Sequence, residues 1–385
     1  MKSNYRSVYT AFDPYPSRKG SAIHIKKASQ VLSHRFGKTL LLTLPRQVHS
    51  RVRRPIKHMQ FQVKESNYLQ RAQAYSHWVD EVLNGQHHLQ VGHFRDIWGG
   101  QPILKRSSLL SVFEVNGLPS IELTNRFNYI TQDTIQKITQ LEDYCLQQCD
   151  VILCPSETIK THLISRNVIK DKIHVLPNGA TVPIAMNKPS WAPEEYIVYF
   201  GALQPWQGVD VLLKAMQYLA DKPNLKLIIC SSHKEKFSRP YKKLILRLDL
   251  EQQVIWKHKL NKQTLDKVLQ HAMASIAPLT ECSRNLKQGC SPLKIFESMA
   301  CKAPIIASDL PVVREILTPE VDAKLVRPDR PAELARAIRL LVDYPQLRKD
   351  LASNAFDKLS ERYTWEKIDA KLSDFYDKLV INVYA

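Results

Sequence analysis

Short apolar runs alternate with helical patterns along almost the whole chain, and this alternation constrains the fold more than any other feature of the sequence. Before residue 180 the runs are SVYTAF (7–12), TLLLTL (39–44), LQVGHF (89–94), LLSVFEV (109–115), VILCPS (151–156) and KIHVLP (172–177). After residue 195 they are YIVYFGAL (196–203), LKLIICS (225–231), VIWKHK (254–259), ASIAPLT (274–280), PIIASD (304–309) and AKLVRP (323–328). Helical patterns separate them, for example at 20–35, 65–83, 132–148 and 157–168. This order is typical of parallel sheets, so we predict an α/β protein with doubly wound sheets.

The chain is expected to form two domains. Its 385 residues exceed the length of one ordinary domain. Residues 180–195 hold three prolines and little periodicity, which is typical of a linker. We predict an N-terminal domain at 1–182, a second domain at 195–362, and a C-terminal helix at 363–385 that packs back on the first. Ligands of such sheets bind beyond the carboxyl ends of the strands, so we expect the site in the cleft between the two halves.

The net charge of +18 implies an acidic partner. Two stretches carry much of it, HSRVRRPIKH (49–58) and HKEKFSRPYKKLILR (233–247), and each by itself also fits a solvated face. Zinc-finger, RNP-type and basic-zipper patterns are missing, which favours an anionic membrane surface over nucleic acid. The first residues show no apolar signal segment, and no apolar run reaches the about 20 residues of a membrane span. Seven cysteines without a C-x-x-C pair fit a reducing compartment, so we predict a cytoplasmic protein, peripheral at the inner membrane face.

The segment CSPLKIFESMA (290–300) predicts an anion site. Ser291 and Pro292 are typical of a helix start, with Ser at the N-cap and Pro at N1. Lys294 would then be the N3 residue, where a cation opposes the helix dipole unless an anion binds there. We expect the first-turn N–H groups and Lys294 to hold a diphosphate, with Arg284 and Gly289 completing the pocket. Glu297 lies three residues after Lys294, so the residues alone leave two interpretations open: a surface ion pair or a ligand contact.

At this point the sequence resembles glycosyltransferase family 4, the large GT-B family of nucleotide-sugar-dependent enzymes also described as group 1. QGCSPLKIFESMACKAPIIASDLPVVREIL is similar to its C-terminal signature. Further segments resemble it in the expected order: YPSRKGSAIHI (15–25), HFRDIWGGQP (93–102), FEVNGLPSIEL (113–123), CDVILCPSETIK through HVLPNGAT (149–181), YFGALQPWQGVDVLLKAM (199–216) and RYTWEKI (362–368). The resemblance implies two Rossmann-like domains facing across a cleft, an acceptor site in the N-terminal half, a nucleotide-sugar site in the C-terminal half, and a C-terminal crossover helix.

The resemblance also implies residue roles in the donor site. Glu297 corresponds to the second carboxylate of the family's E-x7-E pair and would accept hydrogen bonds from the ribose. The first carboxylate is replaced by Gly289, and SPLK replaces the usual glycine-rich turn. The common Arg and Lys of the donor-domain opening are also absent, with Ala202 and Gln207 at the nearest positions. The expected donor-binding residues are Gly20, Gly201, Gln207, Arg284, Gly289, Ser291, Pro292, Leu293, Lys294 and Glu297.

The expected catalytic and acceptor residues lie in the first half. His93, Arg95 and Asp96 are the candidate catalytic residues, because many family members carry a His near the reacting sugar where this chain has Arg95. A buried structural Arg95–Asp96 ion pair is the alternative. Asn116, Asn125 and Arg126 are the candidate acceptor residues, although polar loop residues also serve turns.

Together these features predict a retaining glycosyltransferase of the hexosyltransferase type. It would move a sugar from a nucleotide-diphosphate donor to an acceptor hydroxyl in polysaccharide or glycolipid synthesis, with a carbohydrate or lipid-linked acceptor and no nucleic acid partner. No cofactor beyond the nucleotide-sugar co-substrate and no metal is expected, and the sequence contains no D-x-D. The leaving diphosphate oxygen would take the acceptor proton. Two alternatives stay open: a non-catalytic nucleotide-sugar or polyanion-binding protein, and a GT-B nucleotide-sugar epimerase.

Overall fold

The computed structural model describes residues 4–17, 20–46, 54–62, 64–127 and 129–384. The chain forms two compact units, which are described separately below. Unit 1 comprises Met1–Pro177 and Asp369–Ala385, and unit 2 comprises Asn178–Ile368. The unit boundaries lie at 177/178 and 368/369, and the domain bounds of 1–182, 195–362 and 363–385 stay a prediction.

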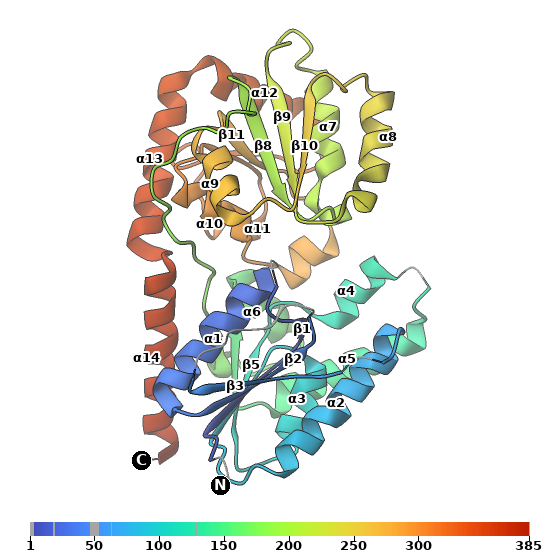
Figure 1. The fold of residues 1–385 in the computed structure, drawn as a ribbon, viewed down its shortest axis with the longest axis vertical. Coiled ribbons are helices and arrows are strands. Elements are labelled where there is room, and N and C mark those ends of the chain that lie inside the picture. The colour runs from blue at the N-terminus through green and yellow to red at the C-terminus, as the bar shows by residue number, and fades with distance from the viewer. Residues whose placement is uncertain (1–3, 18–19, 47–53, 63, 128, 385) are drawn as a thin grey trace. The chain divides into compact units, whose positions relative to one another are not determined.

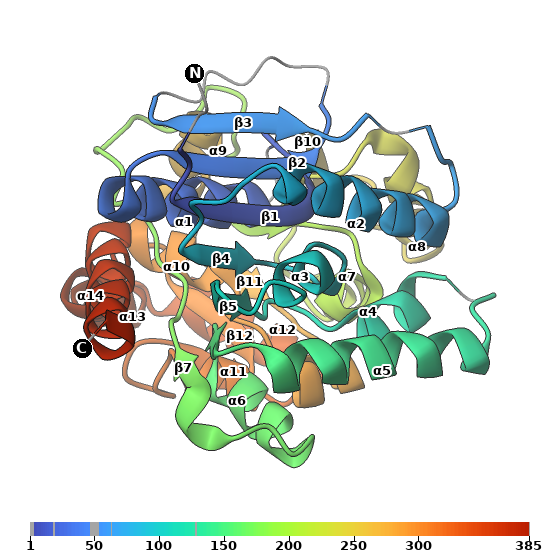
Figure 2. The same ribbon diagram turned by 90° about the horizontal axis from the view of Figure 1, so that it is seen from below.

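Unit 1 is a parallel sheet covered by helices on both faces. Its elements are β1 (Ser7–Pro14), α1 (Gly20–Phe36), β2 (Thr39–Leu44), β3 (Ile56–Gln60), α2 (Tyr68–Asn84), β4 (Val91–Phe94), α3 (Ile97–Leu104), β5 (Leu110–Glu114), α4 (Pro119–Arg126), α5 (Gln132–Gln148), β6 (Val151–Cys154), α6 (Glu157–Ser165), η1 (Lys170–Lys172), β7 (Ile173–Val175) and the later part of α14 (Trp365–Tyr384). The strand order is β3-β2-β1-β4-β5-β6-β7. Figure 2 shows the run from β3 through β2, β1 and β4 to β5. β1 lies between β2 and β4, where Ser7 pairs with Thr39 on one side and Val91 on the other.

Alternating residues of the unit 1 strands build two cores. Val8 packs in a cluster with α2, α3, α5 and α6. Tyr9 and Ala11 of the same strand pack on the opposite face, with α1 and with Leu372 and Tyr376 of α14. Apolar residues on both faces are expected of a strand buried between two helical layers.

Unit 2 repeats this architecture. Its elements are β8 (Tyr196–Gly201), η2 (Pro205–Gln207), α7 (Val209–Gln217), β9 (Lys226–Ser231), η3 (Glu235–Ser238), α8 (Arg239–Arg247), β10 (Val254–His258), α9 (Lys262–Gln270), β11 (Ala274–Ala277), η4 (Arg284–Gln288), α10 (Leu293–Ala300), β12 (Ile305–Ser308), α11 (Pro311–Arg314), β13 (Lys324–Val326), α12 (Pro331–Asp343) and α13 (Pro345–Arg362). The strand order is β10-β9-β8-β11-β12-β13. α7, α8 and α12 cover one face, and α9, α10 and α13 cover the other (Figure 1). The α/β class predicted from the alternation is confirmed in both units.

Three elements differ from the sequence interpretation. β3 lies at residues 56–60, within a stretch that we had interpreted only as basic; residues 49–53 of that stretch lie outside the described part. α3 was not predicted, and α4 contains Asn125 and Arg126, which were treated as loop residues. α4 begins at Pro119, which is a favourable first residue of a helix. No helix of the described residues is long and apolar enough to cross a bilayer.

Candidate functional site

A buried carboxylate organises the carboxyl edge of the unit 1 sheet. Glu114 is the last residue of β5. Its Oε1 accepts hydrogen bonds from Arg95 Nη1 and from Asn116 Nδ2, each at 2.5 Å, and its Oε2 accepts one from the Tyr9 hydroxyl at 2.7 Å. Arg95 also approaches Asp13, with Nε 3.7 Å from Oδ2. Burial alone would raise the pKa of Glu114, but the Arg95 guanidinium and two histidines hold that pKa well below its usual range.

The two histidines reach Glu114 from different elements. His24 Nδ1 of α1 lies 3.1 Å from Oε1, and His93 Nε2 of β4 lies 3.2 Å from Oε2. The His93 ring is fully buried, and its Nδ1 is hydrogen bonded to the Tyr376 hydroxyl of α14. Burial lowers the pKa of His24 more than the hydrogen bond to Glu114 raises it. The arrangement is a charged hub, the Glu114 cluster, in which one buried carboxylate joins Arg95 and both histidines.

Asp96 serves as a helix cap. One of its oxygens accepts hydrogen bonds from the Trp98 and Gly99 N–H groups, at 3.1 and 2.9 Å, and the other accepts one from Phe12 N–H at 2.5 Å. These contacts fix the first turn of α3 against β1. Burial raises the pKa of Asp96 to about 6. The Arg95–Asp96 ion pair that was the alternative interpretation does not form, because Arg95 pairs with Glu114 and Asp13 instead. A catalytic role for Asp96 stays a prediction.

The three candidate acceptor residues separate in the structure. Asn116 belongs to the Glu114 cluster, as described above. Asn125 Nδ2 donates to the Ile121 carbonyl oxygen of its own helix at 3.0 Å. The Arg126 guanidinium lies 5.5 Å from the centroid of the Tyr68 ring and 5.2 Å from that of Phe127. The structure therefore brings Asn116, Arg95 and His93 together and places Asn125 and Arg126 at the end of α4.

In unit 2, Lys294 is a buried cation whose direct hydrogen-bond partner is neutral, with the Glu297 carboxylate acting on it electrostatically without a direct ion pair. Its Nζ donates to Gln207 Oε1 at 2.5 Å and lies 4.2 Å from the centroid of the Tyr199 ring. A Cβ atom on Gly201 would lie 3.7 Å from the Lys294 side chain, and the Gly201 φ of +124° is a conformation that favours glycine. Burial lowers the pKa of Lys294 to about 7. The donor residues Gly201, Gln207 and Lys294 thus meet at the end of β8, beside the switch point between β8 and β11.

The predicted helix start at Ser291 is wrong. α10 begins at Leu293, with Pro292 as its N-cap and no side-chain cap. The Ser291 hydroxyl instead accepts a hydrogen bond from Asn178 N–H at 3.0 Å, and Asn178 Nδ2 donates to the Ser291 carbonyl at 2.6 Å. Asn178, which is distant in sequence, thus binds the hydroxyl that the local pattern predicted to cap the helix. Lys294 is consequently the second residue of the helix, still within its first turn.

Glu297 does not pair with Lys294. Its Oε1 lies 3.5 Å from Nζ of Lys262, the first residue of α9. Lys262 also forms an ion pair with Asp266, one turn further along that helix. Burial raises the pKa of Glu297, and Lys262 opposes that rise. The surface ion pair with Lys294 is therefore excluded, and the carboxylate is held by another helix.

The other candidate donor residues lie in unit 2, around η4 and the start of α10, except for Gly20, which lies in unit 1. Gly289 has a φ of +71° and ends η4, where its N–H donates to the Arg284 carbonyl at 2.9 Å. The Arg284 guanidinium lies 5.3 Å from the centroid of the Trp206 ring. Leu293 is half-buried in the first turn of α10. Gly20 begins α1 and belongs to unit 1, whereas the remaining donor candidates belong to unit 2.

Sequence reasoning missed several members of these sites. Glu114, His24, Tyr9 and Tyr376 were not identified, and neither was Lys262. Glu114 had one signal: it is a carboxylate at the end of an apolar run, where a buried charge needs partners. For Lys262, no feature of the sequence indicates a contact with Glu297. Among the described residues, no group of three or more His, Cys, Asp or Glu side chains is placed to hold a metal ion. Metal-independent chemistry stays a prediction.

Comparisons with known proteins place these sites in context. Residues 184–358 match the family model described as glycosyl transferases group 1. An uncharacterized glycosyltransferase of Methanocaldococcus jannaschii is 26% identical, over 61% of this chain and 62% of its own length. The O-antigen chain mannosyltransferase of Salmonella typhimurium is also 26% identical, over 62% of this chain and 64% of its own length. The chain thus spans less than two thirds of the length of these relatives.

Solved structures share the fold at low sequence identity. Sucrose-phosphate synthase from Thermosynechococcus elongatus superposes with a TM-score of 0.80 at 15% identity, covering 98% of this chain and 100% of that chain. HepE from Anabaena, in complex with UDP and glucose, gives a TM-score of 0.73 at 15% identity, covering 97% and 100%. WaaG, a glycosyltransferase involved in lipopolysaccharide biosynthesis, gives 0.74 at 13%, covering 96% and 99%. These matches show that the chain has the GT-B fold.

Proposed function

We propose that this chain, whose residues 184–358 match the family model described as glycosyl transferases group 1, transfers a sugar from a nucleotide-diphosphate donor to an acceptor hydroxyl. The burial of Lys294 without a direct ion-pair partner among the described residues carries this proposal; burial lowers its pKa more than Glu297 raises it. A buried ammonium is unfavourable unless a negative charge compensates it, and the pKa of about 7 expresses that cost. The hydrogen bond to the Gln207 amide supplies a dipole but no charge. A diphosphate bound at Nζ would supply the missing charge.

The donor would bind along α10. Its diphosphate would contact Lys294 and the N-terminal end of the helix, and the ribose hydroxyls would donate to Glu297, one turn later. As the glycosidic bond breaks, negative charge grows on the diphosphate, and a fixed cation stabilises that charge more in the transition state than in the ground state. We further propose transfer with retention and without metal: the departing phosphate oxygen takes the acceptor proton, and Lys294 supplies positive charge.

The acceptor would bind at the Glu114 cluster. Arg95, Asn116 and His24 place donors around one buried carboxylate at the carboxyl edge of the unit 1 sheet. Such a hub can orient a sugar hydroxyl through a hydrogen-bonded histidine or amide. The names of the similar proteins, an O-antigen chain mannosyltransferase and a lipopolysaccharide glycosyltransferase, support an acceptor in polysaccharide or glycolipid synthesis. A lipid-linked acceptor would fit attraction of the basic chain to the inner face of an anionic membrane.

A donor panel tests the proposal. UDP-, GDP- and ADP-sugars are offered to the wild type, Lys294→Ala and Glu297→Ala, and nucleotide release is measured. We expect release from at least one donor and a loss of about 100-fold or more in Lys294→Ala, because one transition-state donor of this kind contributes about that much. Lys287→Ala is the matched control, since Lys287 lies exposed in the neighbouring η4. No release and no binding with any donor would contradict the proposal.

The replacement of the first family glutamate by Gly289 favours one second candidate, a non-catalytic nucleotide-sugar-binding protein. The same panel separates the two, because that protein would bind a donor tightly without releasing nucleotide. A nucleotide-sugar epimerase would convert the donor with no acceptor present, so product analysis under those conditions identifies it.

A further inference from the structure

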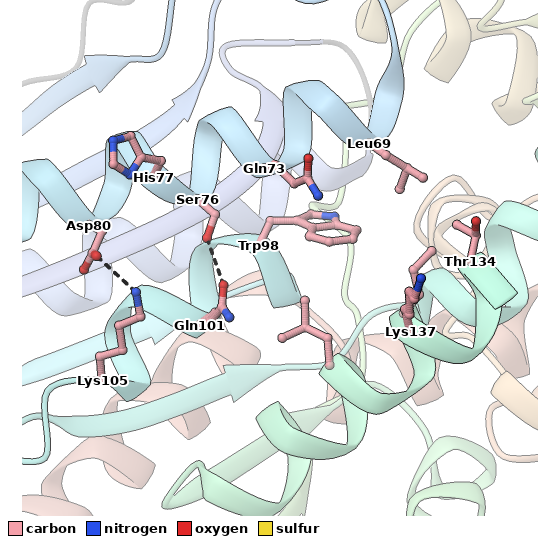
Figure 3. A pocket seen from close by; sticks show the side chains of 12 residues that line it. Leu69, Gln73, Ser76, His77, Asp80, Trp98, Gln101, Lys105, Thr134 and Lys137 are labelled. Atoms are coloured by element: carbon pink, nitrogen blue, oxygen red, sulfur yellow. Dashed lines mark hydrogen bonds and ion pairs between the residues drawn. The ribbon is translucent and has the colours of Figure 1, made fainter.

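A groove runs along unit 1 between α2, α3 and α5, outside both sites described above (Figure 3). Its volume of about 560 Å³ lies within the range of ligand sites, about 300–1,000 Å³. α2 contributes residues spaced three and four apart, which place one face of the helix along the groove. The residues that carry the argument are Leu69, Gln73 and Ser76 of α2, Trp98 and Gln101 of α3, and Ile138 of α5.

The charged residues around this groove form ion pairs with residues of opposite charge. Lys105 Nζ lies 3.1 Å from Asp80 Oδ2, and Lys137 Nζ lies 2.8 Å from Asp133 Oδ2. His77 pairs with Glu81 at 3.3 Å. In a chain with a net charge of +18, the groove therefore offers no concentration of free cations. This disfavours a phosphate or a polyanion, which would need unpaired Lys or Arg side chains.

Neutral hydrogen-bonding groups line the groove instead. Within the described residues, the Gln73 amide makes no hydrogen bond with the protein. Gln101 accepts only from the Ser76 hydroxyl, at 3.4 Å, which is longer than the about 2.7–2.8 Å of a strong O–H···O bond. Both amides can donate and accept at the same time. Leu69 and the buried Ile138 add apolar surface beside them.

We propose that this groove binds a neutral carbohydrate chain, as a secondary site for an extended acceptor. A sugar ring presents hydroxyls at its edge and C–H groups on its faces, and amides beside aliphatic side chains complement both. The N-terminal ends of α2, α3 and α5 lie at the carboxyl edge of the parallel sheet, where Arg95 and Glu114 lie. Trp98, at the start of α3, follows Arg95 by three residues and links the groove to that edge. The identity of this ligand as an acceptor rests on the proposed function.

The groove is tested by binding, without donor or transfer. The probes are three soluble neutral polysaccharides, a glucan, a mannan and a galactan, each cast into a native gel that retards a binding protein. We expect retardation of the full chain by at least one of them. Gln73→Ala combined with Gln101→Ala should weaken that binding by about tenfold, since two hydrogen bonds are lost. Gln70→Ala combined with Gln140→Ala is the control, because both residues are exposed on α2 and α5 and do not line the groove.

The unfolding temperature of each variant, measured alongside, shows that the amide variants remain folded. No retardation by any of the three polymers would overturn the proposal, and so would equal retardation of both double variants. Retardation abolished by dextran sulfate and not by the neutral polymer in solution would also overturn it, because the site would then be cationic. Nucleotide release from a donor without acceptor tests the proposed function separately, so either one can fail alone.

Discussion

The Lys294 ammonium donates to the Gln207 side-chain oxygen at 2.5 Å, so a buried cation on α10 faces a neutral amide on η2. The family resemblance places a cation near the Gln207 position, and this chain carries its cation on the other element. Under the proposed function, Lys294 would supply the charge that the common Arg and Lys provide in the family. It also makes the site sensitive to pH, because burial has lowered the pKa of Lys294 to about 7.

Donor binding should weaken as the pH rises above about 7. The free protein then holds Lys294 neutral, and a diphosphate must recruit a proton to form its ion pair, so affinity should fall by up to about tenfold per pH unit. Calorimetric titration with UDP or GDP at about pH 8, in two buffers of different ionisation enthalpy, measures the proton uptake. Lys294→Arg is the control, because a guanidinium stays protonated and should bind with a flat pH profile. Proton uptake that persists in the Arg variant would place the titrating group elsewhere.

Removing the Lys294 charge should stabilise the fold while abolishing activity. The folded pKa lies below the unfolded value of 10.5, so the group destabilises the fold below that pH, and the full penalty is present below about 7. Lys294→Met keeps the aliphatic length without the charge. We expect its free energy of unfolding at about pH 6 to rise by about 1–2 kcal/mol, with nucleotide release lost. Urea unfolding provides the first quantity, and an unchanged or lower stability would argue that the ammonium has a compensating partner.

Lys262 should control the ionisation of Glu297. Its Nζ lies 3.5 Å from the carboxylate, whose pKa burial already raises. Lys262→Met should raise that pKa further, so the donor KM should increase as the pH falls, with kcat less affected. Lys262→Arg should restore the profile, because it returns the positive charge. A KM that changes equally at every pH would indicate that Lys262 contacts the donor directly.

The sequence predicted the architecture well because strand and helix periods are local. β2 and α5 fall at the predicted residues, 39–44 and 132–148, since an apolar run and an amphipathic repeat report burial directly. β3 was missed because its intermediate burial at the sheet edge leaves a polar, basic pattern.

The site was less predictable because its members meet only in the folded chain. The local pattern predicts that Ser291 caps a helix, whereas in the folded chain its hydroxyl accepts a hydrogen bond from Asn178 N–H. The spacing predicts that Glu297 pairs with Lys294, whereas in the structure Glu297 forms an ion pair with Lys262 of another helix. The Glu114 cluster joins α1, β1, β4, β5 and α14, which no local pattern can reveal.

Two replacements of Asp96 distinguish a structural role of this residue from a catalytic one. Asp96→Ala removes the cap of α3 and the bond to Phe12 N–H, and should lower the free energy of unfolding by about 1–2 kcal/mol. Asp96→Asn keeps the bonds to Trp98 and Gly99 N–H through its oxygen and should lose less. If Asp96 acts only as a cap, transfer per folded molecule should be unchanged in the Asn variant; a large loss there would support catalysis.

Replacing Glu114 should lower the free energy of unfolding strongly. Glu114→Ala leaves the Arg95 guanidinium buried beside two histidines, and removing one partner of a buried pair costs about 3–5 kcal/mol. The folded pKa of Glu114 lies well below the usual value of 4.5, so its contribution is present above that pH and is lost as the pH falls toward the folded pKa. The difference between wild type and Glu114→Ala in urea unfolding should therefore be large at about pH 7 and shrink in acid. Glu81→Ala, on the exposed face of α2, controls for loss of a surface carboxylate. A difference that stayed constant into acid would mean that Glu114 acts through packing and not through its charge.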